Sequence, residues 1–146
     1  QLLKDNINKT ISPAFKELYM REILGNISIH LKTIYNEGGR KFAFQNLGPL
    51  GCQPHVRFTL KDKGLCVKEL QDMLVLHNAE FSKLMQQLES QLPEFKYSVY
   101  DFYSSAYQRF LNGQKFGFKE TQIACCGSGD FHGDFTCEKK DENFTV

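Results

Sequence analysis

The chain has 146 residues and a mass of 16.9 kDa, the size of one ordinary domain. Its formal net charge of +1 argues against a non-specific nucleic-acid binder, which would need a basic surface. No apolar run approaches the roughly 18 residues of a transmembrane helix. The chain begins with Gln1 and polar residues, without a leader sequence, as expected of a processed or partial chain.

A long helix is predicted to begin at Pro13, because Ser12 can cap it and proline suits the first helical position. Gly38 and Gly39 mark its end. Gly25 weakens it by about 1 kcal/mol relative to alanine, so we allow a break there. Its apolar positions recur three and four residues apart: Phe15, Leu18, Tyr19, Ile23, Leu24, Ile27, Leu31, Ile34 and Tyr35.

The next elements are a strand over residues 41–47, a loop to about residue 65 and a helix over about 66–92. A second strand over 95–101 places Tyr97, Val99 and Asp101 on one face. A shorter helix follows near residues 102–112, and the glycine-containing remainder shows no periodicity. The inward residues of this shorter helix are expected to be Phe102, Ala106, Tyr107 and Phe110.

A strand, a long helix and a second strand in succession predict a right-handed crossover between parallel strands. The fold class is therefore α/β. Two strands are fewer than a stable sheet usually contains. We therefore expect the chain to be part of an α/β fold that has further strands.

Cysteines and glycosylation sequons together favour a secretory, oxidising compartment. The odd number of cysteines requires either a free thiol or a partner on another chain. The three sequons begin at Asn8, Asn26 and Asn143, and the five cysteines are Cys52, Cys66, Cys125, Cys126 and Cys137.

Few residues suggest catalysis, a metal or a cofactor. Ser128 lies between two glycines, but no strand precedes it and the nucleophile-elbow pattern is incomplete. Cys125, Cys126, His132 and Cys137 lack paired zinc-type spacing, so we expect disulfides and no metal site. No phosphate-binding glycine motif is present, and no cofactor is expected.

Three segments resemble the plant GDSL esterase/lipase family, a branch of the SGNH hydrolases. The first runs from Gly39 to Pro54 and includes Gly-Pro-Leu-Gly-Cys at 48–52. The second runs from His77 to Ser104, and the third from Tyr107 to Gly129. The resemblance implies a partial SGNH-hydrolase fold, a flavodoxin-like three-layer arrangement of parallel strands and covering helices, over residues 1–146. It also implies a secreted protein, extracellular or vacuolar, and an ester or lipid-like substrate.

The family's catalytic motifs are absent from this sequence. Its Gly-Asp-Ser-Leu nucleophile block, its oxyanion-hole blocks and its Asp-x-x-His block have no counterpart here, so no catalytic residue is assigned. In the intact enzyme a Ser would attack the ester, a His would act as base and an Asp would orient the His. The resemblance also implies a Cys52–Cys66 disulfide, and a downstream cysteine as partner for one of Cys125, Cys126 and Cys137.

Three functions remain open at this point. The first is a portion of a secreted ester hydrolase, whose missing blocks could be carried by a companion chain. The alternative is a truncated or degenerate, non-enzymatic interaction or storage glycoprotein. A small metal- or ligand-binding module built on the tail, with its cysteines and glycines, is a weaker third. Open α/β sheets bind ligands beyond the carboxyl ends of their strands. The candidate pocket-lining residues there are Asn46, Leu50, His55, Phe102 and Tyr103.

Overall fold

The computed structural model of the chain describes residues 12–137. The helices are α2 (Pro13–Asn36), α3 (Pro54–Thr59), α4 (Lys68–Gln91) and α5 (Phe102–Leu111). The strands are β1 (Lys41–Gln45) and β2 (Lys96–Tyr100). Short 3-10 helices cover Leu50–Cys52 (η1), Gly113–Phe116 (η2) and Asp130–His132 (η3).

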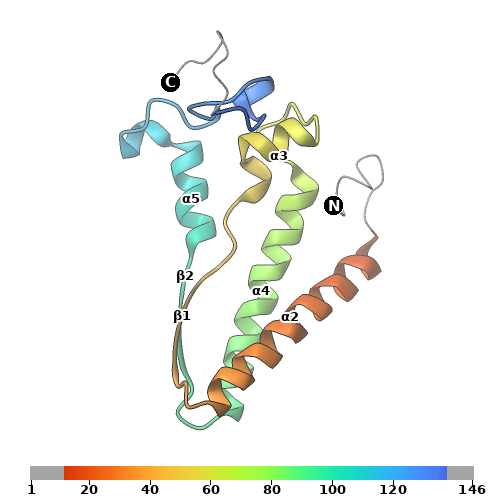
Figure 1. Cartoon of the computed structure of the whole chain (residues 1–146), viewed down its shortest axis with the longest axis vertical. Helices are drawn as coiled ribbons and strands as arrows, with labels where there is room; N and C mark the ends of the chain where they lie inside the picture. The colour runs from red at the N-terminus through yellow and green to blue at the C-terminus, as the bar shows by residue number, and fades with distance from the viewer. Residues whose placement is uncertain (1–11, 138–146) are drawn as a thin grey trace.

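The two strands pair in parallel, with Phe42 opposite Tyr97 and Phe44 opposite Val99. Helix α4 connects them, and α2 and α4 lie on the same side of the pair (Figure 1). The α/β class and the parallel pairing predicted from the sequence are confirmed. Both strands point toward α5, α3 and the tail, so the loops that follow the strands gather at one end of the molecule (Figure 1).

The hydrophobic core lies between the strands and the two long helices. Met85 and Leu88 of α4 and Phe95 before β2 are almost completely buried. The Phe42 ring stacks on Phe95 with centroids 4.6 Å apart, and the Phe44 ring meets Phe81 edge-on at 5.4 Å. This packing fixes the strand pair, and hence the positions at which the two strands end.

Helix α2 begins and ends as the sequence predicts. The Ser12 hydroxyl accepts a hydrogen bond from the Phe15 N–H at 3.2 Å, and Gly38 follows the helix with a φ of 99°, a conformation that favours glycine. The break allowed at Gly25 is absent. Leu24 and Ile27 on either side of it pack against the core, and this packing outweighs the cost of one glycine.

The segment predicted as a loop over residues 48–65 instead contains η1 and α3. Pro54 takes the first position of α3, which suits its fixed φ and missing N–H. The first strand ends at Gln45 rather than 47. Asp101 does not share the inward face of Tyr97 and Val99, because it is exposed and caps α5.

The tail after α5 is held by a disulfide between Cys126 and Cys137 and by an isolated bridge between Ser128 and Asp134. A second disulfide joins Cys52 to Cys66, as the family resemblance implied, and Cys125 is an exposed free thiol. Among the sequons, Asn26 is exposed on α2, while Asn8 and Asn143 lie outside the described residues. Within residues 12–137, no helix is long and apolar enough to cross a membrane.

Candidate functional site

An apolar crevice with a volume of about 230 Å³ opens beyond the carboxyl ends of β1 and β2. One side is the loop that follows β1, and the other is the inward face of α5. Gly48 allows this close approach, because a Cβ there would lie 2.6 Å from the Phe102 ring. The lining comprises Gly48, Pro49, Leu50, Cys52, Gln53, Pro54, Phe102, Ala106, Phe110 and Thr121.

Side-chain amides hold the loop that forms the first side of the crevice. The Asn78 carboxamide on α4 pairs with the Leu47 backbone, accepting from its N–H at 3.0 Å and donating to its carbonyl at 2.8 Å. Farther along, the Gly51 N–H donates to Gln71 Oε1 at 3.0 Å. The Cys52–Cys66 disulfide closes the same loop. The loop is therefore fixed to α4 at Asn78 and Gln71, and by the disulfide to Cys66, which precedes α4.

The second side, α5, is fixed at its N-terminus by Asn46 and Asp101. Asn46 Nδ2 donates to Asp101 Oδ1 at 2.9 Å, and Asn46 Oδ1 accepts from the Tyr103 N–H at 2.8 Å. Asp101 also accepts from the Ser104 N–H. Hydrogen bonds from Ser104 and then Asn46 lower the pKa of the Asp101 carboxyl below its ordinary value, because they stabilise its charged form.

Tyr103 points from α5 toward α4 rather than into the crevice. Its hydroxyl accepts a hydrogen bond from Gln71 Nε2 at 3.0 Å. Burial, followed by the neighbouring Tyr107 and Asp72, raises the pKa of the Tyr103 phenol above its ordinary value. Gln71 thus links the loop at Gly51 to α5 at Tyr103.

His55 lies on α3 and faces the tail. Its Nδ1 donates to the Gly133 carbonyl at 2.7 Å, and its ring stacks on Phe135 with centroids 4.0 Å apart. Its Nε2 lies 3.4 Å from the Thr59 hydroxyl. Both ring nitrogens of His55 therefore face groups of the protein, and the ring lies outside the crevice lining.

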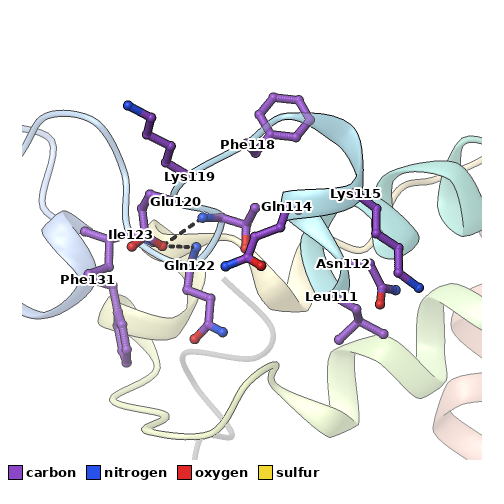
Figure 2. A pocket seen from close by; sticks show the side chains of 12 residues that line it. Leu111, Asn112, Gln114, Lys115, Phe118, Lys119, Glu120, Gln122, Ile123 and Phe131 are labelled. Atoms are coloured by element: carbon purple, nitrogen blue, oxygen red, sulfur yellow. Dashed lines mark hydrogen bonds between the residues drawn. The ribbon is translucent and has the colours of Figure 1, made fainter.

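A second, more polar hollow of about 540 Å³ lies at the far end of α5 (Figure 2). The carboxamide of Gln114 lies near its middle, while Lys119 extends away from it (Figure 2). The Glu120 carboxylate accepts hydrogen bonds from the N–H groups of Thr121, Gln122 and Ile123. These bonds, led by those from Gln122 and Thr121, lower the pKa of Glu120. Thr121 lines both the hollow and the apolar crevice.

The structure therefore separates the five predicted pocket residues into three groups. Leu50 and Phe102 line the crevice, Asn46 and Tyr103 hold its two sides in place, and His55 faces the tail. The sequence analysis did not assign Thr121 or the proline-rich part of the loop to a pocket. It placed Ala106 and Phe110 on the inward face of α5 without relating them to a cavity. Among residues 12–137, no group of three or more His, Cys, Asp or Glu side chains is arranged to hold a metal ion.

Comparison with known proteins identifies relatives for nearly the whole chain. The sequence pattern of the family described as GDSL-like Lipase/Acylhydrolase matches residues 4–135. The chain is 40% identical over 129 residues to GDSL esterase/lipase 4 of Arabidopsis thaliana, covering 88% of this chain and 34% of that protein. It is also 40% identical over 126 residues to a GDSL lipase of Tanacetum cinerariifolium, covering 86% of this chain and 34% of that protein.

A third relative carries a different name. The Arabidopsis thaliana protein called inactive GDSL esterase/lipase-like protein 25 is 38% identical over 126 residues, covering 86% of this chain and 30% of that protein. The chain thus spans about a third of the length of these curated relatives.

Proposed function

The chain belongs to the GDSL-like lipase/acylhydrolase family, and we propose that residues 1–146 form part of the domain of a carboxylic ester hydrolase. The observation that carries the proposal is the apolar crevice at the carboxyl ends of two parallel strands. Open α/β sheets bind their ligands at this edge, and an apolar lining suits the acyl or alkyl part of an ester.

In this proposal the chain supplies one wall of the substrate site and no reacting group. A Ser nucleophile, a His base and an orienting Asp would come from sequence outside these 146 residues, or from a companion chain. Water would cleave the ester into a carboxylic acid and an alcohol. The role of this chain is to bind the apolar group beside the reacting atoms, which brings the ester to the nucleophile.

Leu50 and Phe102 are proposed to contact the substrate directly, because both line the crevice. Asn46 and Tyr103 are proposed as positioning residues for the loop and for α5. Alanine at any of these four residues is expected to change the rate or selectivity of ester cleavage. Alanine at His55 is expected to have the smallest effect of the five, because its ring contacts the tail.

The test of the proposed activity uses the full-length protein and the 146-residue chain side by side. The full-length protein is expected to hydrolyse p-nitrophenyl esters and to be labelled by a serine-directed fluorophosphonate. The shorter chain, which lacks the nucleophile block, is expected to do neither. Failure of the purified full-length protein to cleave any ester of the series would reject the proposal.

We also propose that the protein passes through the secretory pathway and is extracellular or vacuolar. Two disulfides and an exposed Asn26 within a sequon support this, because both features are typical of secreted proteins. The non-enzymatic alternative, an interaction or storage glycoprotein, is not favoured. One relative is named inactive, but an interaction or storage role gives no reason for an apolar crevice at the strand ends.

A further inference from the structure

We propose that Asn26 carries an N-linked glycan and that this glycan shields the outward face of α2, the face turned away from the strands. The inference goes beyond ester hydrolysis and does not depend on it. It rests on the proposed secretory route, because N-glycosylation takes place in that pathway. It adds a modified residue, the chemical group that this residue carries and the surface that the group protects.

The sequence around Asn26 meets the chemical requirement for the modification, since Asn26, Ile27 and Ser28 form a sequon. The transfer forms a bond between Asn26 Nδ2 and C1 of N-acetylglucosamine. It breaks the bond from that carbon to the diphosphate of a lipid-linked oligosaccharide. The lipid diphosphate is the leaving group, and the amide nitrogen loses one proton. Because the transfer acts on the nascent chain before α2 folds, the position of Asn26 within a helix does not prevent it.

The folded chain places Asn26 where a glycan leaves the core undisturbed. The inward face of α2 is formed by Leu24, Ile27 and Leu31, which belong to the core against α4 and the strands. At 3.6 residues per turn, Asn26 points away from this inward face. Its side chain is exposed. A glycan on Asn26 therefore extends into solvent.

The outward face of α2 is expected to stay at the surface of the whole domain. Helices α2 and α4 cover one side of the strand pair, and in an α/β fold the helices form the outer layers. Further strands would widen the sheet, and further helices would lie beside α2 or cover the other side of the sheet. The rest of the domain would therefore leave the outward face of α2 uncovered.

Exposed apolar side chains lie close to Asn26 on this outward face. Ile29, almost one turn further along, is 62% exposed, and Leu18, about two turns before Asn26, is 45% exposed. Residues three or four apart are neighbours on a helix surface, so Leu18, Glu22, Asn26 and Ile29 follow one another along it. N-Acetylglucosamine has a methyl group and a C–H face that can cover Ile29, and hydroxyl groups that remain in water. The glycan thus replaces an exposed apolar surface with a polar one.

The first test measures whether Asn26 is glycosylated. The full-length protein would be purified from plant cells, and its peptides treated with peptide-N-glycanase in heavy-oxygen water, which turns a glycosylated asparagine into labelled aspartate. Wild type and Ser28→Thr, which keeps the sequon, are expected to be labelled at residue 26, and Ser28→Ala is expected to lose the label. Asn36→Gln is the matched control, because Asn36 is exposed on α2 outside any sequon, and it should keep the label. Secreted wild type with no label at Asn26 would overturn the inference and leave the secretory route standing.

The second test measures the shielding by hydroxyl-radical labelling of side chains. Glycosylated wild type would be compared with Asn26→Gln and with wild type deglycosylated after folding, so the result does not depend on how the variant folds. Labelling of Ile29 is expected to rise several-fold without the glycan. Ile34, which is 50% exposed two turns beyond Asn26, should be labelled equally in all three.

Equal labelling of Ile29 with and without the glycan would overturn the shielding. Ester hydrolysis is expected to be the same in all three proteins. A glycosylated, shielded protein that cleaves no ester would reject the proposed activity alone, and retention of the protein in the cytosol would reject the secretory route together with this inference.

Discussion

Asn46 Nδ2 lies 2.9 Å from Oδ1 of Asp101, so the residue that follows β1 is bonded to the residue that caps α5. The same carboxamide accepts the Tyr103 N–H. These contacts fix the angle at which α5 leaves the strand pair. Because Phe102, Ala106 and Phe110 project from α5 into the crevice, its shape depends on this connection.

Asn46→Ala is predicted to destabilise the full-length protein by about 1–2 kcal/mol, because it removes two hydrogen bonds and leaves the Tyr103 N–H without its partner. Urea unfolding measures the change. Gln45→Ala is the matched control, since this neighbouring side chain is exposed, and its effect is expected to stay within about 0.5 kcal/mol. Equal changes in unfolding free energy for the two substitutions would contradict the view that Asn46 holds α5 in place.

The charge of Asp101 predicts a dependence of stability on pH. The pKa of this carboxyl is lowered from its ordinary value of 3.8, chiefly by hydrogen bonds from Ser104 and Asn46. Its contribution to stability is therefore complete above that value and is lost as the pH falls through the lower, folded-state pKa. Asp101→Asn should make stability decline less steeply in this acidic window. The comparison requires unfolding curves of both proteins at a series of pH values, and equal slopes would contradict the prediction.

Arg57 on α3 is predicted to hold the tail, residues 122–137, against the rest of the protein. Its side chain is buried, donates to the carbonyls of Gly64 at 3.0 Å and Gln122 at 3.1 Å, and lies 3.6 Å from the centre of the Phe131 ring. Arg57→Met is expected to cost about 3 kcal/mol, because both carbonyls lose their donor. It should also speed proteolysis within residues 122–137.

The matched control for Arg57 is Arg21→Met on the exposed surface of α2. This substitution should leave both the unfolding free energy and the cleavage rate close to wild type. Comparable proteolysis of the two variants would show that Arg57 does not hold the tail.

The two disulfides leave one of the five cysteines as a free thiol. Cys52–Cys66 and Cys126–Cys137 are paired and Cys125 is free, so thiol titration of the unfolded, unreduced 146-residue segment should find one reactive group. Replacing both Cys52 and Cys66 with alanine should lower the free energy of unfolding by about 3 kcal/mol, the chain-entropy value for a disulfide that closes a loop of this size. A non-reducing peptide map that places Cys125 in a disulfide with Cys126 or Cys137 would contradict the pairing.

The long elements could be predicted because their sequence patterns are local. Apolar residues at helical spacing mark α2 and α4, and alternation marks β2. Helix α3 was missed because six residues are too few to show helical periodicity, and prolines and glycines surround it. Its buried Arg57 gave no signal, because the carbonyls that it satisfies lie up to 65 residues away.

The crevice could be anticipated only in part. Strand polarity indicated the edge of the sheet and named Leu50 and Phe102, which line it. It could not separate them from His55, whose partners Gly133 and Phe135 come from the distant tail. Thr121 was not anticipated either, since its position depends on contacts with Gly113 and Phe110 that no local pattern encodes.

The most direct test of the central claim, that this chain forms an apolar substrate wall, is the selectivity of the full-length protein between two esters. The ratio of kcat/KM for p-nitrophenyl octanoate over butanoate would be measured in wild type, Phe102→Ala and Phe116→Ala. Phe116 contacts Arg109 away from the crevice and serves as the matched control. The ratio should fall about threefold or more in Phe102→Ala and stay at the wild-type value in Phe116→Ala. An unchanged ratio in Phe102→Ala would contradict the claim.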